Sequence, residues 1–240
     1  MSELEVARDG GVTRLTLDRA NKANALSADL VEALLAAVGA AATNGTRLLV
    51  LDGAGSHFCA GFDFTDYDSA TDAELALRFI RIETLLQALY TAPFETLALA
   101  HGRVFGAGAD LVASCALRVA TADAAFLMPG LRFGVVLGTR RFAARVGNDE
   151  AREILSASRA FVAEEALRCG FLTQIAEKER WEEIVAAARA QSERLSPAAA
   201  AALRCHTRAD TGAEDMAALA RSVSEPGLRE RIRAFREQQK

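Results

Sequence analysis

A run of glycines that leads to a single acid is the part of this sequence best suited to chemistry. The stretch Thr96–Asp123 begins with a strand-like alternation, passes through Gly102, Gly106 and Gly108, and continues with helical spacing. A helix that begins at a glycine bend leaves main-chain N–H groups unpaired at the positive end of its dipole, where a negative oxygen is stabilised. Asp110 stands in the predicted first turn. The stretch predicts half of an oxyanion hole beside an acid/base, although on its own it favours the alternative of a packing turn whose acid complements the dipole.

The elements around this stretch predict an α/β protein. A long loop with three glycines and several acids precedes it, and loops of that length in a compact domain are usually functional. From Thr139 onward the pattern is almost entirely helical, with breaks at Pro197 and Pro226. We therefore expect an α/β core followed by a helical C-terminal region. The other expected elements are a hairpin over 4–17, a helix over 27–42, a buried strand over 48–51, a helix over 72–90, and short strands over 117–120 and 125–128.

Composition excludes several classes of function. The net charge of −4 gives no electrostatic footprint for nucleic acid. No apolar run is long enough to span a membrane, and the first residues lack a secretory pattern. The four cysteines form no CxxC pair and the three histidines are scattered, so neither a disulfide framework nor a metal site is expected. These features predict a cytoplasmic protein that binds neither nucleic acid nor membrane.

Familiar nucleotide and hydrolase motifs do not fit. In FGAGADL, Leu111 stands where a dinucleotide fingerprint needs a third glycine or alanine. The sequence has no GxxxxGK[ST] loop and no G-x-S-x-G elbow. The chemistry therefore has to be sought elsewhere.

Four segments occur in the order found in one known family. They are LDRANKANALS, LVLDGAGSHFCAGFDF, HGRVFGAGADLVASCALRVAT and FVAEEALRCGFLTQIA. Together they make the chain, from about residue 15 to 176, resemble the enoyl-CoA hydratase/isomerase family, also called the crotonase superfamily. The resemblance implies a ββα-spiral core, taken as residues 1–195, and a helical oligomerisation region over 196–240. It also implies fatty acid metabolism, an acyl-CoA substrate, no cofactor other than the coenzyme A of that substrate, and a homotrimer or dimer of trimers.

The resemblance also implies particular site residues. The main-chain N–H groups of Ala60 and Ala107 would hold the oxygen of the thioester, and small side chains there would let it approach; the family more often has glycine at the second position. Asp63 is expected to bond loop amides rather than to react. His57 and His101 are taken as loop or core residues. The residues implied to line the substrate side are Lys22, Ala23, Ala25, Leu26, Ala60, Gly61, Phe62, Asp63, Gly106 and Ala107, with Arg19 as another candidate for a phosphate.

The sequence departs from the family at the catalytic acids. Hydratases of the family use two glutamates; Asp110 occupies the first position and Gly130 the second. Loss of one acid/base commonly costs about 10²–10⁴ in rate, so an efficient two-acid hydratase is not expected. Asp66 and Asp68 are weaker candidates for the missing group. The leading prediction is enoyl-CoA hydratase/isomerase-type chemistry with Asp110 as acid/base; the alternatives are a non-catalytic acyl-CoA-binding or assembly protein and a thioester hydrolase.

Overall fold

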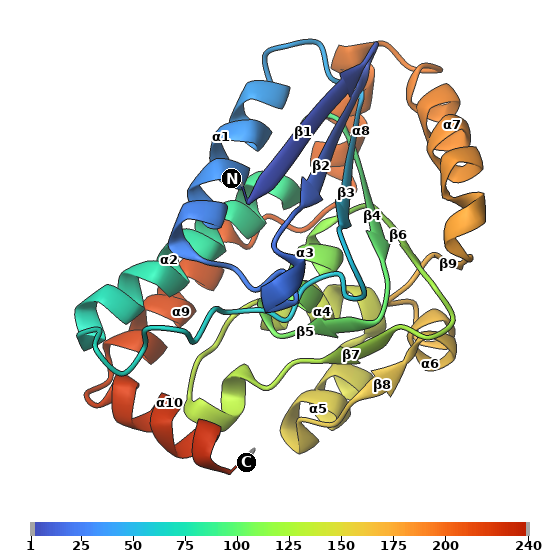
Figure 1. Ribbon diagram of the computed structural model, residues 1–240. Helices are drawn as coiled ribbons and strands as arrows, with labels where there is room; N and C mark the ends of the chain where they lie inside the picture. Colours follow the sequence, from blue (N-terminus) through green and yellow to red (C-terminus); the bar gives the residue numbers. More distant parts are fainter. Residues whose placement is uncertain (1–2, 239–240) are drawn as a thin grey trace.

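Two sheets organise the computed structural model, which describes residues 3–238 (Figure 1). The larger sheet has the strand order β1-β2-β3-β4-β6-β9; β1 and β2 are antiparallel and the other neighbours are parallel. The smaller sheet has the order β5-β7-β8. The strands of the larger sheet are β1 (Leu4–Asp9), β2 (Val12–Leu17), β3 (Leu48–Gly53), β4 (Glu95–Ala100), β6 (Leu117–Ala120) and β9 (Gln174–Ile175). Those of the smaller sheet are β5 (Arg103–Phe105), β7 (Ala125–Leu127) and β8 (Phe161–Val162).

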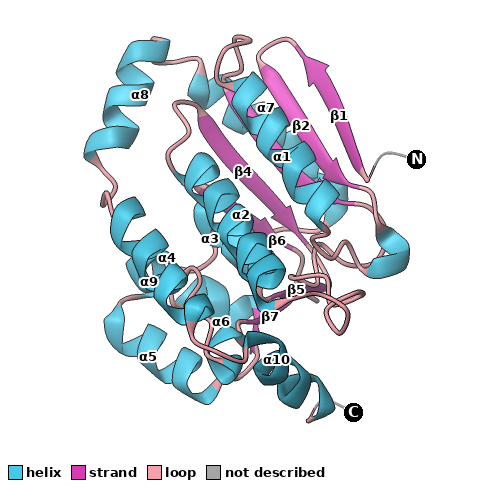
Figure 2. Ribbon diagram, turned by 90° about the vertical axis from the view of Figure 1, so that its left-hand side faces the viewer, coloured by secondary structure: helices cyan, strands magenta, loops and turns pink. Residues whose placement is uncertain are grey.

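Helices cover both faces of the larger sheet (Figure 2). Because alternate residues of a strand point to opposite faces, the side chains of β3 belong to two hydrophobic clusters, one on each face of the sheet. Leu49 and Leu51 join the main core with α1 (Ala28–Ala41) and α2 (Asp72–Tyr90), whereas Leu48 and Val50 pack with Trp181 at the start of α7 (Trp181–Ser192). The continuous apolar run of β3 therefore follows from burial on both faces.

Local sequence signals start the main helices where they were predicted. The hydroxyl of Ser27 accepts a hydrogen bond from the amide of Leu30 at the start of α1. Thr71 and Glu74 form a capping box at the start of α2. The predicted hairpin, both of these helices and the buried strand are confirmed, whereas the two- and three-residue strands β5, β8 and β9 were not predicted.

The C-terminal helices pack on the same chain. Leu219 and Val223 of α9 (Gly212–Ser224) and Ile232 and Phe235 of α10 (Leu228–Glu237) are buried in the main core. Both helices contact α2, so they extend the core instead of standing apart from it. No residue of α8 (Pro197–His206) is buried. The proposed oligomerisation role of residues 196–240 stays a prediction.

The remaining elements complete the chain, and of these α3 contacts β5 and α6 contacts β8 in the smaller sheet. They are α3 (Ala107–Ser114), α4 (Thr139–Val146), α5 (Asn148–Ala157), α6 (Ala163–Arg168), and the 3₁₀ helices η1 (Ala20–Lys22), η2 (Gly130–Phe133) and η3 (Lys178–Arg180). Within residues 3–238, no helix is long and apolar enough to cross a membrane.

Candidate active site

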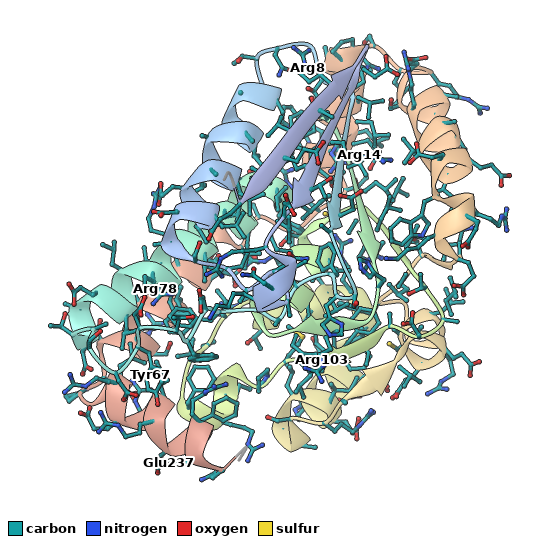
Figure 3. The ribbon with its side chains drawn as sticks, in the orientation of Figure 1. Arg8, Arg14, Tyr67, Arg78, Arg103 and Glu237 are labelled. Atoms are coloured by element: carbon teal, nitrogen blue, oxygen red, sulfur yellow. The ribbon has the colours of Figure 1, made fainter. Side chains whose placement is uncertain are left out.

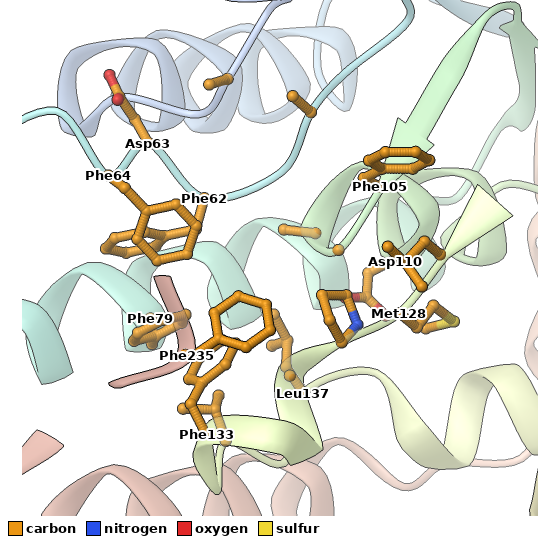
Figure 4. A pocket seen from close by; sticks show the side chains of 18 of the residues that line it. Phe62, Asp63, Phe64, Phe79, Phe105, Asp110, Met128, Phe133, Leu137 and Phe235 are labelled. Carbon is orange, nitrogen blue, oxygen red and sulfur yellow. The ribbon is translucent and has the colours of Figure 1, made fainter. Parts of the chain in front are cut away.

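A cavity of about 770 Å³ lies where several parts of the chain meet, mainly the four named next. Its walls come from the loop before α2, the start of α3, the segment 127–139 and the end of α10. Figure 4 shows two different ends: Phe62, Phe64, Phe133 and Phe235 gather at one, and Asp110 lies at the other. The cavity thus combines an aromatic end with charged and polar side chains elsewhere in its wall, and a concave site of mixed lining can hold a small molecule with both apolar and polar parts.

Asp110 is the buried acid of this cavity. It lies in the first turn of α3, is 3 % exposed, and its Oδ1 has no hydrogen-bond donor among the described residues. Burial raises the pKa of Asp110 well above its ordinary value; the charge of Arg141 lowers this pKa and the charge of Glu83 raises it further. A methyl group added at Gly138 would stand 1.8 Å from Oδ1, so that glycine leaves the space in which the carboxyl lies.

Two main-chain amides face this region without a partner. A methyl group added at Gly61 would stand 3.2 Å from the amide nitrogen of Ala107, which shows how closely the loop approaches the start of α3. Among the described residues, the amides of Phe62 and Ala107 have no acceptor. Both residues line the cavity.

The amide of Ala60 is already occupied, because it donates to the carbonyl of Ala23 at 2.9 Å. This contradicts its predicted role as an oxyanion donor. The amide of Phe62, which the resemblance did not single out, is unpaired among the described residues instead, because the local pairing decides which amide is free. The amide of Leu26 donates to the carbonyl of Gly61, and the amide of Asp63 donates to the carbonyl of Leu26. These two bonds make up the parallel bridge between Leu26 and Phe62, and the amide of Phe62 itself takes no part in it. The sequence does not show which of these amides pairs.

Most of the residues implied to contact substrate line the cavity. Ala23 has positive φ in the turn after η1, Leu26 is fully buried, and Gly61 has a φ of 88° beside the carbonyl of Phe105. These three do not line the cavity. The ones that line the cavity are Lys22, Ala25, Ala60, Phe62, Asp63, Gly106 and Ala107.

Asp63 has a structural role, as predicted. Its carboxylate accepts from the amide of Thr65 at 2.9 Å and pairs with Arg19 at 2.8 Å. Burial opposes ionisation, but these bonds lower the pKa of Asp63 overall. Arg19 also pairs with Glu3, so its guanidinium is not free for a phosphate. Lys22 is exposed and lines the cavity, so its predicted contact with a phosphate of the substrate stays a prediction.

Of the carboxyl groups that line the cavity, Asp110 alone is buried and unpaired in the described residues. Asp68 pairs with Arg233 at 3.1 Å and its side chain is 62 % exposed. Gly130 lies in the wall, and a methyl group added there would meet the carbonyl of Val135 at 3.0 Å. A side chain at the second position would therefore require a small shift of the Val135 carbonyl.

The two histidines do not take part in this site. His101 is buried and its Nε2 contacts the carbonyl of Gly55 at 3.0 Å, while His57 lies nearby; neither lines the cavity. Polar groups that do line it include Arg103 on β5 and Tyr67 on the loop before α2, which are labelled well apart in Figure 3.

The spiral arrangement of the two sheets and their crossing helices, with a cavity at the start of α3, defines a protein of the crotonase fold. The model of the enoyl-CoA hydratase/isomerase family matches residues 7–229, and the chain belongs to this family. One relative is the protein named "Probable enoyl-CoA hydratase echA6" of Mycobacterium tuberculosis, which is 34 % identical over 167 residues, or 68 % of this chain and 67 % of that protein.

Solved structures agree with the family assignment. A crystal structure from Bordetella parapertussis, named for enoyl-CoA hydratase/isomerase, is 49 % identical with a TM-score of 0.96, over 97 % of this chain and 98 % of the other. An enoyl-CoA hydratase from Bacillus halodurans has a TM-score of 0.86 at 22 % identity, over 97 % of this chain and all of that one, and at that identity it shows the fold alone.

Proposed function

We propose that this protein catalyses enoyl-CoA hydratase/isomerase-type chemistry on an acyl-CoA thioester. One observation carries the proposal: two unpaired amides and one buried, unpaired carboxyl line the same cavity. The amides of Phe62 and Ala107 hold the thioester oxygen as it gains negative charge, and Asp110 exchanges a proton with the acyl carbons. Such donors act most strongly in a dry site, where each contributes about 3 kcal/mol to the stabilisation of an enolate.

Within this chemistry, the single acid favours a shift of the double bond over the addition of water. One carboxylate can remove a proton from one acyl carbon and return it to another, and no second acid is needed to activate water. The raised pKa of Asp110 suits this role because it brings the group closer to a pH at which it both takes and gives a proton. The neighbouring wall is apolar, with Met128, Val135 and Leu137.

The experiment compares Asp110→Asn with the unaltered protein on crotonyl-, dienoyl- and malonyl-type CoA thioesters. We expect turnover to fall by about 10²–10⁴ while CoA affinity, measured by calorimetry, is retained. Asp52→Asn is the matched control: Asp52 is also a buried aspartate with an unpaired Oδ1, but it does not line the cavity, so its variant should keep full turnover.

Two results would replace this proposal. Saturable binding with no turnover of any thioester would indicate a non-catalytic acyl-CoA-binding or assembly protein. Release of free thiol would indicate a thioester hydrolase. Turnover that is the same in Asp110→Asn would remove Asp110 from the mechanism.

A further inference from the structure

A buried cluster of charges lies behind Asp110, outside the cavity. Arg141, on the first turn of α4, is 2 % exposed and pairs with Glu83 of α2, which is 1 % exposed. Its Nη1 donates to Glu83 at 3.0 Å and to Asp215 of α9 at 3.4 Å. Arg140 adds a bond to Asp215 at 3.1 Å. Neither Glu83 nor Arg141 lines the cavity, so neither is placed to touch substrate.

The bonds of this cluster leave Asp110 without a partner. Both terminal nitrogens of Arg141 are taken by Glu83 and Asp215, and its Nε has no acceptor in the described part of the chain. Asp110 Oδ1 has no donor there either, although Arg141 is near enough for its charge to act on that carboxyl. A buried carboxyl beside an arginine would ordinarily pair with it.

The charges of the four ion-paired groups of the cluster balance without Asp110. Arg140 and Arg141 carry two positive charges, and Glu83 and Asp215 carry two negative charges. Ionisation of Asp110 would add an uncompensated negative charge to a buried region, which is costly. Charged side chains on the elements packed against α3 include Glu83 (α2), Arg141 and Arg145 (α4) and Arg103 (β5), and Asp215 of α9 joins them through Arg141. Of these, Arg145 bonds the carbonyls of Ala113 and Cys115 at the far end of α3.

We propose that Glu83 is a positioning residue that occupies the guanidinium of Arg141 and so keeps it from pairing with Asp110, which leaves the Asp110 carboxyl free to exchange a proton with substrate. The proposal rests on the function proposed for Asp110. Its physical content is a competition: Glu83 and Asp110 are alternative partners for one arginine. If Glu83 loses its charge, Arg141 turns toward Asp110 and stabilises it as a carboxylate. The effect of Glu83 on the pKa of Asp110 has the direction that this requires.

The experiment follows the protonation of Asp110 directly, by the infrared carboxyl band that is lost in Asp110→Asn, in the ligand-free protein across a pH series. We expect the midpoint to move to lower pH in Glu83→Gln. The acid limb of the rate profile should move in the same direction. Glu32→Gln is the matched control, because Glu32 also forms a two-bond pair with an arginine, Arg81, but at the surface. Its midpoint should match that of the unaltered protein.

The infrared reading separates the two proposals. If no thioester is turned over but the midpoint still moves, the function is wrong and the competition is right. An unchanged midpoint in folded Glu83→Gln, checked by its thermal transition, would overturn the positioning role. If that variant does not fold, the double variant Glu83→Gln with Arg141→Met tests the proposal instead. Because the arginine is gone, the midpoint of Asp110 should lie at or above that of the unaltered protein. A lower midpoint would refute the competition.

Discussion

Gly138 gives the sharpest test of how Asp110 is held. The residue precedes α4 with a φ of 66°, in the left-handed region. A methyl group there would stand 1.8 Å from Oδ1 and 2.6 Å from Cγ of Asp110. Real β-carbons do not tolerate such distances, so the carboxyl of Asp110 must move in Gly138→Ala.

The expected cost has two parts. A non-glycine residue in the left-handed region costs about 1–2 kcal/mol. Forcing the Asp110 side chain away from its rotamer costs about 0.5–1.5 kcal/mol more. We therefore expect Gly138→Ala to lower the free energy of unfolding by about 1.5–3.5 kcal/mol. A displaced acid/base should also lower turnover by about 10²-fold, since a misplacement near 1 Å has effects of that size.

Gly227 supplies the matched control. It also precedes a helix, has a φ of 78°, and a methyl group there would meet only Glu230 Oε2 at an ordinary 3.6 Å. Gly227→Ala should therefore show the conformational cost of about 1–2 kcal/mol alone, with turnover kept. Urea unfolding, read at constant m value, measures both variants.

A double-mutant cycle tests the contact itself. In the background of Asp110→Ala the carboxyl is gone, so Gly138→Ala should cost no more than Gly227→Ala does. The reasoning would be refuted if Gly138→Ala cost the same with and without the Asp110 carboxyl, or if it left turnover unchanged.

Three further predictions concern the same pocket. The pKa of Asp110 is near 3.8 in the unfolded chain and higher in the folded protein, so the folded state keeps a proton that the unfolded chain loses. As pH rises above 3.8, the free energy of unfolding should therefore fall relative to that of Asp110→Asn. Urea unfolding of both proteins across pH checks this, and parallel curves would contradict it. Ala107→Pro removes one amide at the first position of α3, where proline fits a helix, and should lower turnover by about 10²–10³, whereas Ala28→Pro, at the first position of α1, should leave it unchanged. Asp72→Ala removes the carboxylate that accepts from the first amides of α10 and should cost about 1–2 kcal/mol by urea unfolding; no change would mean that this cap does not hold the helix.

Local signals account for the parts of the fold that could be predicted. Ser27 and the Thr71–Glu74 capping box begin their helices because their side chains satisfy amides that every helix start leaves unpaired. The hairpin around Gly10 follows from its turn residues in the same way. Strand β8, by contrast, has two residues and is defined only by its pairing with β7, so no periodicity could reveal it.

In the candidate site, too, local sequence signals could be interpreted, whereas contacts between distant residues could not. Asp110 and free amides at a helix start could be predicted because a glycine bend, a helix start and an acid lie within a few residues of one another, and the resemblance then singled out Ala107 among these amides. Phe62 could not be distinguished from Ala60, since the difference is one hydrogen bond from Ala60 to Ala23, 37 residues earlier in the chain. The Glu83–Arg141–Asp215 cluster was missed for a similar reason: its members come from three helices, and only the packed core brings them together.

The segment between η2 and α4 connects these observations. Val135 donates to the carbonyl of Gly130 at 2.9 Å, which closes the turn where a second acid would stand. The segment then ends at Gly138, whose missing side chain leaves space for Asp110. One short piece of chain thus crowds the position of the second acid and makes room for the first. Replacing Gly130 by glutamate would require the carbonyl of Val135 to shift by a few tenths of an ångström, because that oxygen lies 3.0 Å from where the new side chain must begin.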